Sequence, residues 1–457
     1  MGMKQNFISM KRLLRFVAIA AVIAILGGCV YLNRLLPIIT GYAAKNLASA
    51  VFVSGREAKD VEALDLNFSF IRYTSNRVDY EKKTVTSRFL WAKSTAVYRE
   101  GCGVTLLRGA SADELRGQRF PMSVMGEGLA EQDSTHGARL PLGDSAVAER
   151  LAPIAKAFVE ERAYRGHPFA FVVVHKGGVV AECYDKGIGR DTKLLSWSMA
   201  KSFVNALIGI MVKDGMLDIN APTGIAEWQG DERKTITLND LMQMQSGLEW
   251  NEDYGARSDV NIMLHCESDM GLFALMKPLE HAPRTYWQYS SGTTDIVMRY
   301  LRGRFSTDEA FLGYMHSRLF APLGIVGAVF EQDMSGTPVG SSYLYVTALD
   351  YARFGQLYLD DGCVGSERML PEGWVDYTRK PATASGDRYG SLFWLNRCGK
   401  FPDVPKDMFY CDGHDGQDIF IFPSHDLVVV VLGYSPKPGN VIDFNALLRD
   451  VMGAVRD

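Results

Sequence analysis

The stretch S-W-S-M-A-K-S-F-V-N-A-L-I-G, from Ser196 to Gly209, places a serine and a lysine three residues apart at the start of an apolar run. Residues three apart on a helix lie about 5 to 6 Å from each other, so the Ser198 hydroxyl and the Lys201 amine can meet. The residues after Lys201 are apolar on nearly every side, which predicts a buried helix that ends at K-D-G, residues 213–215. The alternative is an N-cap serine with a lysine that extends to solvent.

The surroundings of Lys201 favour a neutral amine near pH 7. Burial disfavours the charged ammonium, and the positive end of the helix acts in the same direction. The same helix end would stabilise an oxyanion that forms beside Ser198. A chain this rich in serine and lysine contains about one such spacing by chance. The pair alone therefore leaves both interpretations open.

Length and composition limit the classes of function. The chain has 457 residues, of which 47% are hydrophobic and 22% charged, as in a globular protein with one large domain or two ordinary ones. A formal net charge of −4 makes nucleic acid an unexpected partner. The sequence has no H-E-x-x-H, G-x-S-x-G or P-loop motif, so we expect no metal site and no cofactor.

Hydrophobic periodicity predicts a mixed α/β fold from residue 144 onward. A helix pattern begins at Ser145, and A-F-V-V-V-H-K-G-G-V-V-A-E-C-Y predicts a hairpin with its turn at Gly177-Gly178. A block of helical periodicity then runs from Ser198 to about Arg304. Strand patterns return after Tyr389, before a closing helix. This order predicts one sheet, built from both ends of the region and flanked by helices, with an all-helical insert.

The first 32 residues predict an export signal or a membrane anchor. Lys11, Arg12 and Arg15 precede a continuous apolar run from Phe16 to Leu32. The run ends with L-G-G-C, which resembles the bacterial lipobox and makes Cys29 a candidate lipidation site. An uncleaved signal anchor is the alternative. Both interpretations place the protein in the cell envelope, exported, with the membrane as a partner.

Residues 33–143 form a separate region of unknown role. Short apolar alternations at Leu64–Phe70, Thr84–Leu90 and Val104–Leu107 predict strands and loops. The six cysteines after Cys29 could pair in an oxidising envelope, and Cys398 with Cys411 is a plausible local bridge. Buried, unpaired thiols are the alternative.

Two motifs further along the chain accompany the Ser198 tetrad. Q-Y-S-S-G-T-T-D begins at Gln288, and G-H-D-G-Q-D-I-F-I-F-P begins at Gly413. In this order, S-x-x-K, Y-x-S and H-x-G resemble the serine β-lactamase and penicillin-binding-protein superfamily, in its class C-like branch. The similarity extends from about Ala146 to the C-terminus. Within that branch, the Y-S-S-G-T-T-D form and V-F-V-S-G-R at Val51 are most similar to 6-aminohexanoate-dimer (nylon-oligomer) hydrolases.

The resemblance implies a β-lactamase-like serine hydrolase domain over residues 144–457 and a role for each motif. Ser198 would be the acylated nucleophile, Lys201 its base or proton relay, and Tyr289 the group that takes the serine proton and passes it to the leaving group. The backbone N–H groups of Ser198 and Gln417 would form the oxyanion hole. The predicted substrate-binding residues are Ser291, His414, Gly416 and Trp287.

Departures from the family pattern affect the expected substrate. Ser291 stands where β-lactamases carry asparagine, and His414 stands where they carry lysine, so efficient β-lactamase activity is disfavoured. We expect a membrane-tethered serine hydrolase that cleaves a small amide or ester. The alternatives are a penicillin-binding-protein-like D-peptidase with weak β-lactamase activity, and a non-catalytic scaffold that retains the fold.

Overall fold

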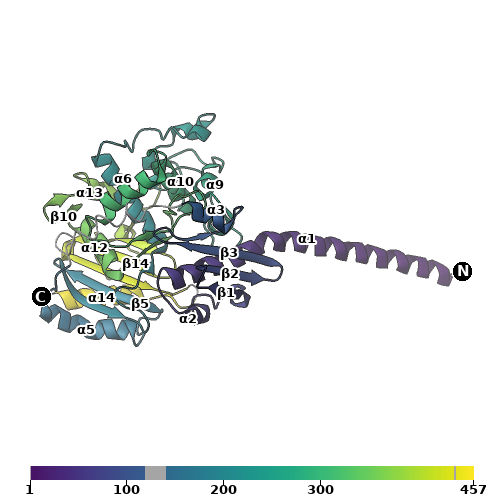
Figure 1. Ribbon diagram of the computed structural model, residues 1–457, viewed down its shortest axis with the longest axis horizontal. Helices are drawn as coiled ribbons and strands as arrows, with labels where there is room; N and C mark the ends of the chain where they lie inside the picture. The colour runs from purple at the N-terminus through teal and green to yellow at the C-terminus, as the bar shows by residue number, and fades with distance from the viewer. Residues whose placement is uncertain (1, 119–139, 437–438, 457) are drawn as a thin grey trace.

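The centre of the molecule is a six-stranded antiparallel sheet in the order β12-β13-β14-β15-β5-β6 (Figure 1). The computed structural model describes residues 2–118, 140–436 and 439–456. Strands from the two ends of the region 144–457 pair with each other, and Val430 of β15 lies opposite Val172 of β5. This pairing confirms the predicted sheet. The strands are β5 (Pro168–His175), β6 (Gly178–Tyr184), β12 (Trp394–Leu395), β13 (Phe409–Gly413), β14 (Gln417–Phe422) and β15 (Leu427–Gly433).

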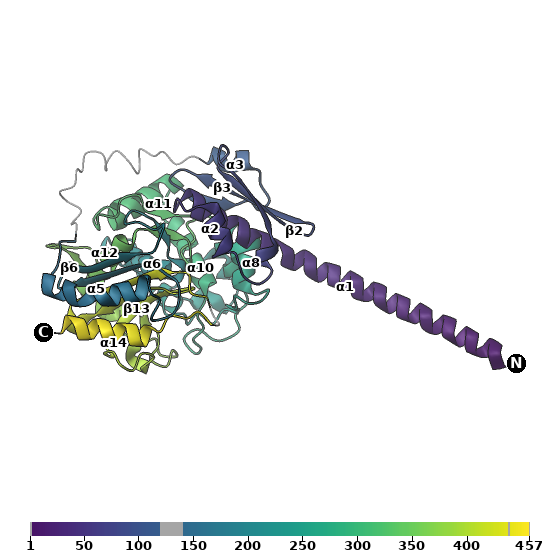
Figure 2. The ribbon, with the colours of Figure 1, turned by 90° about the horizontal axis from the view of Figure 1, so that it is seen from below.

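Helices cover both faces of this sheet, so every residue of β5 and β15 is buried. Successive side chains of a strand point to opposite faces. Phe171 and Val173 pack against α5 (Ser145–Val159) and α14 (Phe444–Val455), which lie side by side in Figure 2. Val172 and Val174 face the core that contains α6 (Ala200–Lys213) and α12 (Ala348–Leu359). Because both faces are covered, the strands are almost continuously apolar.

The predicted hairpin is present, with its turn one residue earlier than expected. Lys176 and Gly177 occupy the turn with φ of 50° and 74°, and Gly178 is already the first residue of β6, opposite His175. Positive φ at both central residues is the geometry that matches the twist of a two-residue hairpin.

A block of helices lies between the two groups of strands, as the periodicity predicts. Its helices are α7 (Leu238–Met242), α8 (Asp259–Cys266), α9 (Met270–Leu275), α10 (Ser291–Arg302) and α11 (Asp308–Met315). Short strands join the block to the rest: β7 (Leu194–Leu195), β8 (Val329–Phe330) and β9 (Leu344–Val346) form one small sheet, and β10 (Cys363–Val364) pairs with β11 (Glu367–Arg368). Helix α13 (Trp374–Thr378) follows this hairpin.

The N-terminal region differs from the expected strands and loops because its first part is one long helix. Helix α1 runs from Gly2 to Phe52, and Ala43, Ala44, Leu47 and Ala48 are fully buried in it. The elements that follow are α2 (Ala58–Ala63), β1 (Ser75–Asp79), β2 (Thr84–Phe89), β3 (Ala92–Arg99), β4 (Gly103–Leu106) and α3 (Ala112–Gly117). Strands β1 to β4 form an antiparallel sheet in chain order, and α1 packs on it. The remainder of the predicted region 33–143 includes residues 119–139, outside the described residues.

Tertiary contacts explain why α1 continues past residue 33. A Cβ atom at Gly41 would lie 2.6 Å from the Arg108 guanidinium and 2.9 Å from the His265 carbonyl oxygen. The glycine that interrupts the helical pattern is therefore required for close packing. The alternation at Leu64–Phe70 also misled the prediction. That segment turns after α2, where Asp65 pairs with Arg56 at 2.6 Å, whereas the strands predicted at Thr84 and Val104 are present as β2 and β4.

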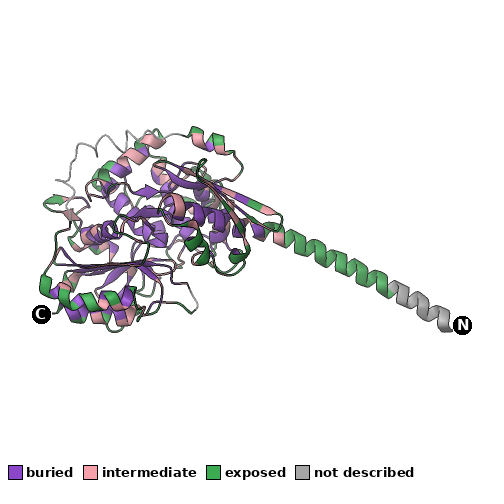
Figure 3. Cartoon of the chain, turned by 60° about the horizontal axis from the view of Figure 1, so that its bottom comes forward, coloured by how far each residue is buried: buried purple, intermediate pink, exposed green. Residues whose placement is uncertain are grey.

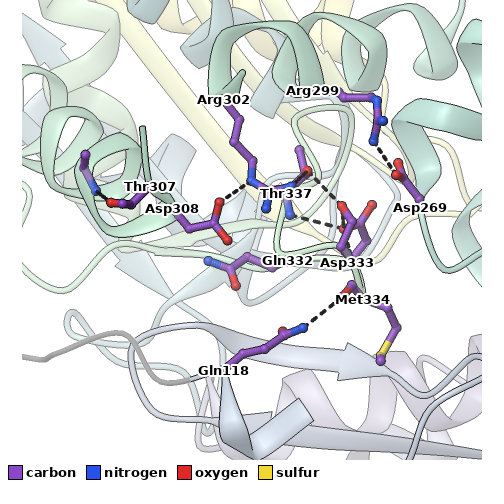
Figure 4. A network of polar contacts seen from close by, with 12 residues as sticks. Gln118, Asp269, Arg299, Arg302, Thr307, Asp308, Gln332, Asp333, Met334 and Thr337 are labelled. Carbon is purple, nitrogen blue, oxygen red and sulfur yellow. Dashed lines mark hydrogen bonds and ion pairs between the residues drawn. The ribbon is translucent and has the colours of Figure 1, made fainter. Parts of the chain in front are cut away.

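The N-terminal region docks through the segment 331–337. Glu331 is fully buried, forms an ion pair with Lys45 of α1, and accepts hydrogen bonds from Ser49 Oγ at 3.0 Å and Val104 N at 2.7 Å. Figure 4 shows the neighbouring contacts, in which Gln118 Nε2 donates to the Met334 carbonyl at 3.3 Å.

The same segment is held from the other side by the helical block. Arg302 of α10 donates to Thr337 Oγ1 at 3.0 Å (Figure 4). The Met270 N–H of α9 donates to Asp333 Oδ2 at 2.9 Å. Burial raises the pKa of Asp333 to about 6. The segment 331–337 thus joins the N-terminal region to the helical block, and the chain continues from it to Ser341.

The first part of α1 projects from the folded body, and Figure 3 shows its exposed surface. Within the helical span Leu13–Phe52, an 18-residue window has a mean hydropathy of 2.5 and is not buried in the protein, so by length and composition this helix could cross a membrane. Cys29 is exposed on this segment. All seven cysteines are free, so the Cys398–Cys411 bridge is not formed, and Cys411 lies buried while Cys398 is exposed.

Candidate active site

Ser198 and Lys201 meet at the start of α6. Ser198 lies in a 3-10 turn, Trp197–Met199, that leads into the helix at Ala200. Trp197 has a φ of 43°, a conformation that is costly for a bulky residue and is held by its buried surroundings. The Lys201 Nζ atom lies 2.9 Å from Ser198 Oγ. The predicted pair is therefore in contact.

Lys201 has two more partners and is fully buried. Its Nζ atom lies 3.0 Å from Ser291 Oγ and 2.9 Å from the Ser341 carbonyl oxygen. Burial lowers the pKa of Lys201 to about 8, and the negative charges of Glu252, Asp295 and Asp412 oppose this shift. An amine with this pKa is partly neutral near physiological pH.

Tyr289 reaches the same point from the loop before α10. Its ring centroid lies 4.9 Å from Lys201 Nζ, and its ring packs against Trp394 at 5.2 Å and Tyr389 at 5.8 Å. Burial raises the pKa of Tyr289 well above its ordinary value, with smaller contributions from Tyr389 and Glu252, and a hydrogen bond with Ser198 opposes the shift. The phenol is therefore protonated near neutral pH.

The β13–β14 hairpin forms the opposite wall. Gly413 is paired with Gln417 across the hairpin, and a Cβ atom at Gly413 would lie 2.4 Å from the Ser196 carbonyl oxygen. Only glycine allows β13 to approach the Ser198 turn this closely. The Gln417 side chain is occupied by Gly433: its Nε2 atom donates a hydrogen bond to the Gly433 carbonyl oxygen at 2.6 Å, and its Oε1 atom accepts one from the Gly433 N–H at 2.9 Å. Only the Gln417 backbone N–H is therefore a candidate for the predicted oxyanion hole.

The four predicted substrate-binding residues occupy different positions. His414 and Gly416 line a cavity of about 500 Å³ that also contains Ser198 and Tyr289. The His414 ring is stacked on Tyr254 at 4.4 Å, and its Nε2 atom lies 3.3 Å from Asp415 Oδ1.

Ser291 and Trp287 are not among the residues that line this cavity. Ser291 is fully buried, and its hydroxyl lies beside Lys201 Nζ, so the structure places this side chain next to the lysine. Trp287 packs behind the wall, against Tyr389 at 5.6 Å and Trp394 at 6.0 Å.

Glu252 is a site residue that the sequence did not reveal. Its carboxylate accepts hydrogen bonds from Ser291 Oγ at 2.5 Å, Ser291 N at 2.9 Å and Trp250 Nε1 at 2.5 Å, and it lines the cavity. The segment W-N-E-D-Y has no periodicity and matches none of the three motifs, so no sequence signal marked it.

Asp295 is a second site residue that was missed. It accepts hydrogen bonds from Ser341 N at 3.0 Å and Ser341 Oγ at 2.9 Å, which fixes the carbonyl that contacts Lys201. Burial raises the pKa of Asp295 to about 7. The sequence places Asp295 at the end of the Y-S-S-G-T-T-D motif, four residues after Ser291. Its partner Ser341 lies 46 residues further along the chain, so the sequence did not indicate the contact.

The lining of the cavity has more acidic than basic side chains. Arg165 and Lys400 are basic, and five other lining residues are acidic. Among the described residues, no group of three or more His, Cys, Asp or Glu side chains is arranged to hold a metal ion. The acidic lining residues are Glu252, Asp412, Asp415, Asp418 and Asp443.

Comparisons with known proteins show the family and the fold of the chain. The sequence model of the family described as Beta-lactamase matches residues 151–450. The chain is 25% identical over 297 residues to the 6-aminohexanoate-dimer hydrolase of Paenarthrobacter ureafaciens, covering 59% of this chain and 73% of that protein.

Two solved structures have the same fold. A candidate 6-aminohexanoate-dimer hydrolase from Bacillus anthracis superposes with a TM-score of 0.55 at 21% identity, covering 70% of this chain and 86% of that one. A penicillin-binding-protein homologue from Caulobacter crescentus superposes with a TM-score of 0.54 at 15% identity, covering 69% and 99%.

Proposed function

The chain belongs to the Beta-lactamase family, and from this premise we propose that it is a serine hydrolase that cleaves a small amide or ester through an acyl-enzyme on Ser198. The observation that carries the proposal is the set of contacts around Lys201 Nζ, which lies within 3.0 Å of Ser198 Oγ, Ser291 Oγ and the Ser341 carbonyl.

These contacts support an assignment of the protons for the neutral form of Lys201. The Ser341 carbonyl can only accept, and Ser291 Oγ already donates its proton to Glu252 at 2.5 Å, so it accepts from Lys201. A neutral amine has two protons, which these two acceptors use, and one lone pair. That lone pair is directed to the Ser198 hydroxyl, which is the geometry of a general base beside a nucleophile.

In acylation, Ser198 Oγ attacks the substrate carbonyl carbon while its proton moves to Lys201 Nζ. The carbonyl oxygen becomes an oxyanion, which the backbone N–H groups of Ser198 and Gln417 would stabilise. When the bond to the leaving nitrogen or oxygen breaks, the protonated Tyr289 phenol donates its proton to that atom, and Lys201 returns a proton to Tyr289. In deacylation, water replaces the leaving group and the steps run in reverse.

Because the pKa of Tyr289 is raised, its phenol is protonated in the resting enzyme and can act as the proton donor. Because the pKa of Lys201 is lowered, its amine can be neutral and act as the base. This division differs from the expected role of Tyr289 as the first acceptor of the serine proton. A base is most effective when its pKa lies near the working pH, which suits the amine and not the phenol.

The cavity supports a small substrate. Its volume of about 500 Å³ lies in the range of sites for small molecules. The acidic lining disfavours anionic groups near Ser198, which agrees with the absence of a lysine at the position of His414.

The proposal includes a membrane tether. The exposed apolar part of α1, preceded by Lys11, Arg12 and Arg15, supports an exported protein whose folded body faces away from the cytoplasm. Cys29 is exposed on this helix, as lipidation would require. Flotation with vesicles and mass analysis of the N-terminus test the anchor and the lipid separately from the enzymatic activity.

A panel of p-nitrophenyl esters and aminohexanoate oligomers tests the reaction. The wild-type chain should hydrolyse at least one member, and Ser198→Ala should abolish that activity, while Ser202→Ala, on the same helix, should retain it. A folded wild-type protein that hydrolyses no member but is labelled by fluorescent penicillin would instead indicate the D-peptidase.

A further inference from the structure

Helix α1 leaves the folded body beside the tip of the β2–β3 hairpin. Trp91, at this tip, donates a hydrogen bond from its indole Nε1 to Asn33 Oδ1 at 2.6 Å. Residues 13–32 of α1 are mostly exposed, whereas those from Leu36 onward are mostly buried. Figures 1 and 2 both show the hairpin pointing along α1 toward its projecting part. Trp91 therefore marks the level at which the helix leaves the protein.

The two residues of this turn are unusual for a hairpin. Two-residue turns favour Gly, Asn and Asp, which adopt positive φ at little cost. Here the turn is Leu90-Trp91, and Leu90 has a φ of 52°. The side chains of Leu90 and Trp91 are 63% and 57% exposed. Strained backbone that presents large apolar groups to solvent points to a partner for those groups.

Two more aromatic residues lie at the same end of the sheet. Phe70 and Tyr73 are both exposed, and the Phe70 ring packs against Phe89, the residue before the turn, at 6.4 Å. Together, Phe70, Tyr73, Leu90 and Trp91 form what we call the tip patch.

Basic side chains surround the tip patch. Arg88 is directly opposite Lys93 on β2 and β3, and both are exposed. Like charges at opposed positions destabilise a sheet unless an anion lies between them. Arg34, next to Asn33, and Arg72, between Phe70 and Tyr73, are also exposed. The carboxylate of Glu62 accepts a hydrogen bond from Asn76. This one negative charge does not balance the positive charges beside the tip patch.

We propose that the tip patch inserts into the headgroup region of the same bilayer that α1 spans, with its basic residues bound to anionic lipid. This inference rests on the membrane tether of the proposed function, in the form in which α1 is retained as an uncleaved anchor. The segment Leu13–Leu32 is about 30 Å long at about 1.5 Å per residue, which matches a hydrocarbon core and places Asn33 at its surface. Trp and Tyr are the residues that prefer this interface. The second contact fixes the tilt and rotation of the folded body on the membrane.

Quenching of tryptophan fluorescence by brominated lipid tests the proposal on the full chain in vesicles. The difference between wild type and Trp91→Phe isolates the emission of Trp91. We expect brominated phosphatidylcholine, mixed with phosphatidylglycerol, to remove at least half of this emission. As a matched control, Trp91→Phe/Tyr80→Trp moves the indole to an exposed position at the opposite end of the same sheet, where we expect no quenching.

The outcomes separate the patch from the anchor and from the enzyme. If the chain floats with the vesicles but Trp91 is quenched no more than a tryptophan at position 80, the tip patch does not contact lipid and the inference is overturned while the anchor stands. If the chain does not float, both membrane contacts are overturned, and the hydrolase proposal is unaffected.

The lipid charge is tested by Arg88→Glu/Lys93→Glu. This variant should lower the quenching of Trp91 at least twofold in vesicles with phosphatidylglycerol and change it little in pure phosphatidylcholine. Equal quenching of the variant and the wild type in both lipids would overturn the role of anionic headgroups.

Discussion

The Nζ atom of Lys201 lies 2.9 Å from Ser198 Oγ and 2.9 Å from the Ser341 carbonyl oxygen, so a single amine joins the start of α6 to the chain that follows the segment 331–337. Asp295 holds the Ser341 backbone in place, and Glu252 holds Ser291. The amine is therefore oriented by buried partners on several elements, and the negative charges of Glu252 and Asp295 raise its pKa against the effect of burial.

Lys201 should control the pH dependence of hydrolysis. Its pKa is about 8, and the neutral amine is the active form, so kcat/KM should rise with pH and level off above about 8. Glu252→Gln removes a negative charge that raises this pKa, so the acid limb should move to lower pH. The pH profile of p-nitrophenyl ester hydrolysis measures both effects. An unchanged acid limb in Glu252→Gln would contradict the assignment of Lys201 as the titrating base.

Lys201→Met should abolish most activity and yet stabilise the protein near pH 7. The pKa of Lys201 is about 8 in the folded state and 10.5 in the unfolded state. Below pH 8 the buried ammonium therefore lowers the free energy of unfolding of the wild type. The wild type regains this stability as the pH rises from about 8 to 10.5. The gain from Lys201→Met in the free energy of unfolding should therefore shrink over that range. Urea denaturation at pH 7 and pH 10 measures it, with Lys213→Met at the other end of the helix as control.

Tyr289→Phe should slow amide hydrolysis far more than hydrolysis of p-nitrophenyl esters. An amide nitrogen must be protonated before it leaves, whereas p-nitrophenolate leaves without a proton. General acid catalysis contributes about 10²–10⁴-fold, and we expect a loss in kcat of this size on amides. Tyr389→Phe, in the same aromatic cluster, is the control. Equal losses on both substrates would exclude Tyr289 as the proton donor.

Lys45→Met should destabilise the folded body, because it leaves Glu331 buried without its counter-charge. Removal of one partner of a buried ion pair costs about 3–5 kcal/mol. Lys45→Met/Glu331→Gln should recover most of this loss, because the neutral amide can still accept hydrogen bonds from Val104 and Ser49. Chemical denaturation of the two variants measures the difference. Similar stabilities for both variants would show that the N-terminal region does not depend on this pair.

The central sheet and the contact between the candidate catalytic residues Ser198 and Lys201 could be predicted from the sequence, because their signals are local. Ser198 and Lys201 are three residues apart, and Tyr289 precedes an apolar helix in a recognisable motif. Alternation and β-branched runs marked β14 and β15. By contrast, Glu252 acts through Ser291, 39 residues away, and no periodicity announces such a contact.

The helix after residue 33 could not be predicted for the same reason. Pro37 and Gly41 interrupt its pattern, and Lys45 is an unexpected residue for a buried helix face. The partner that permits its burial, Glu331, lies 286 residues away. Long-range packing, and not local propensity, determines this element.

Labelling with a fluorophosphonate probe, followed by peptide mapping, tests whether Ser198 is the nucleophile. We expect one covalent adduct per chain, on Ser198, which is lost in Ser198→Ala and retained in Ser202→Ala. A folded, wild-type chain that remains unlabelled, or that carries the adduct on another residue, would contradict it.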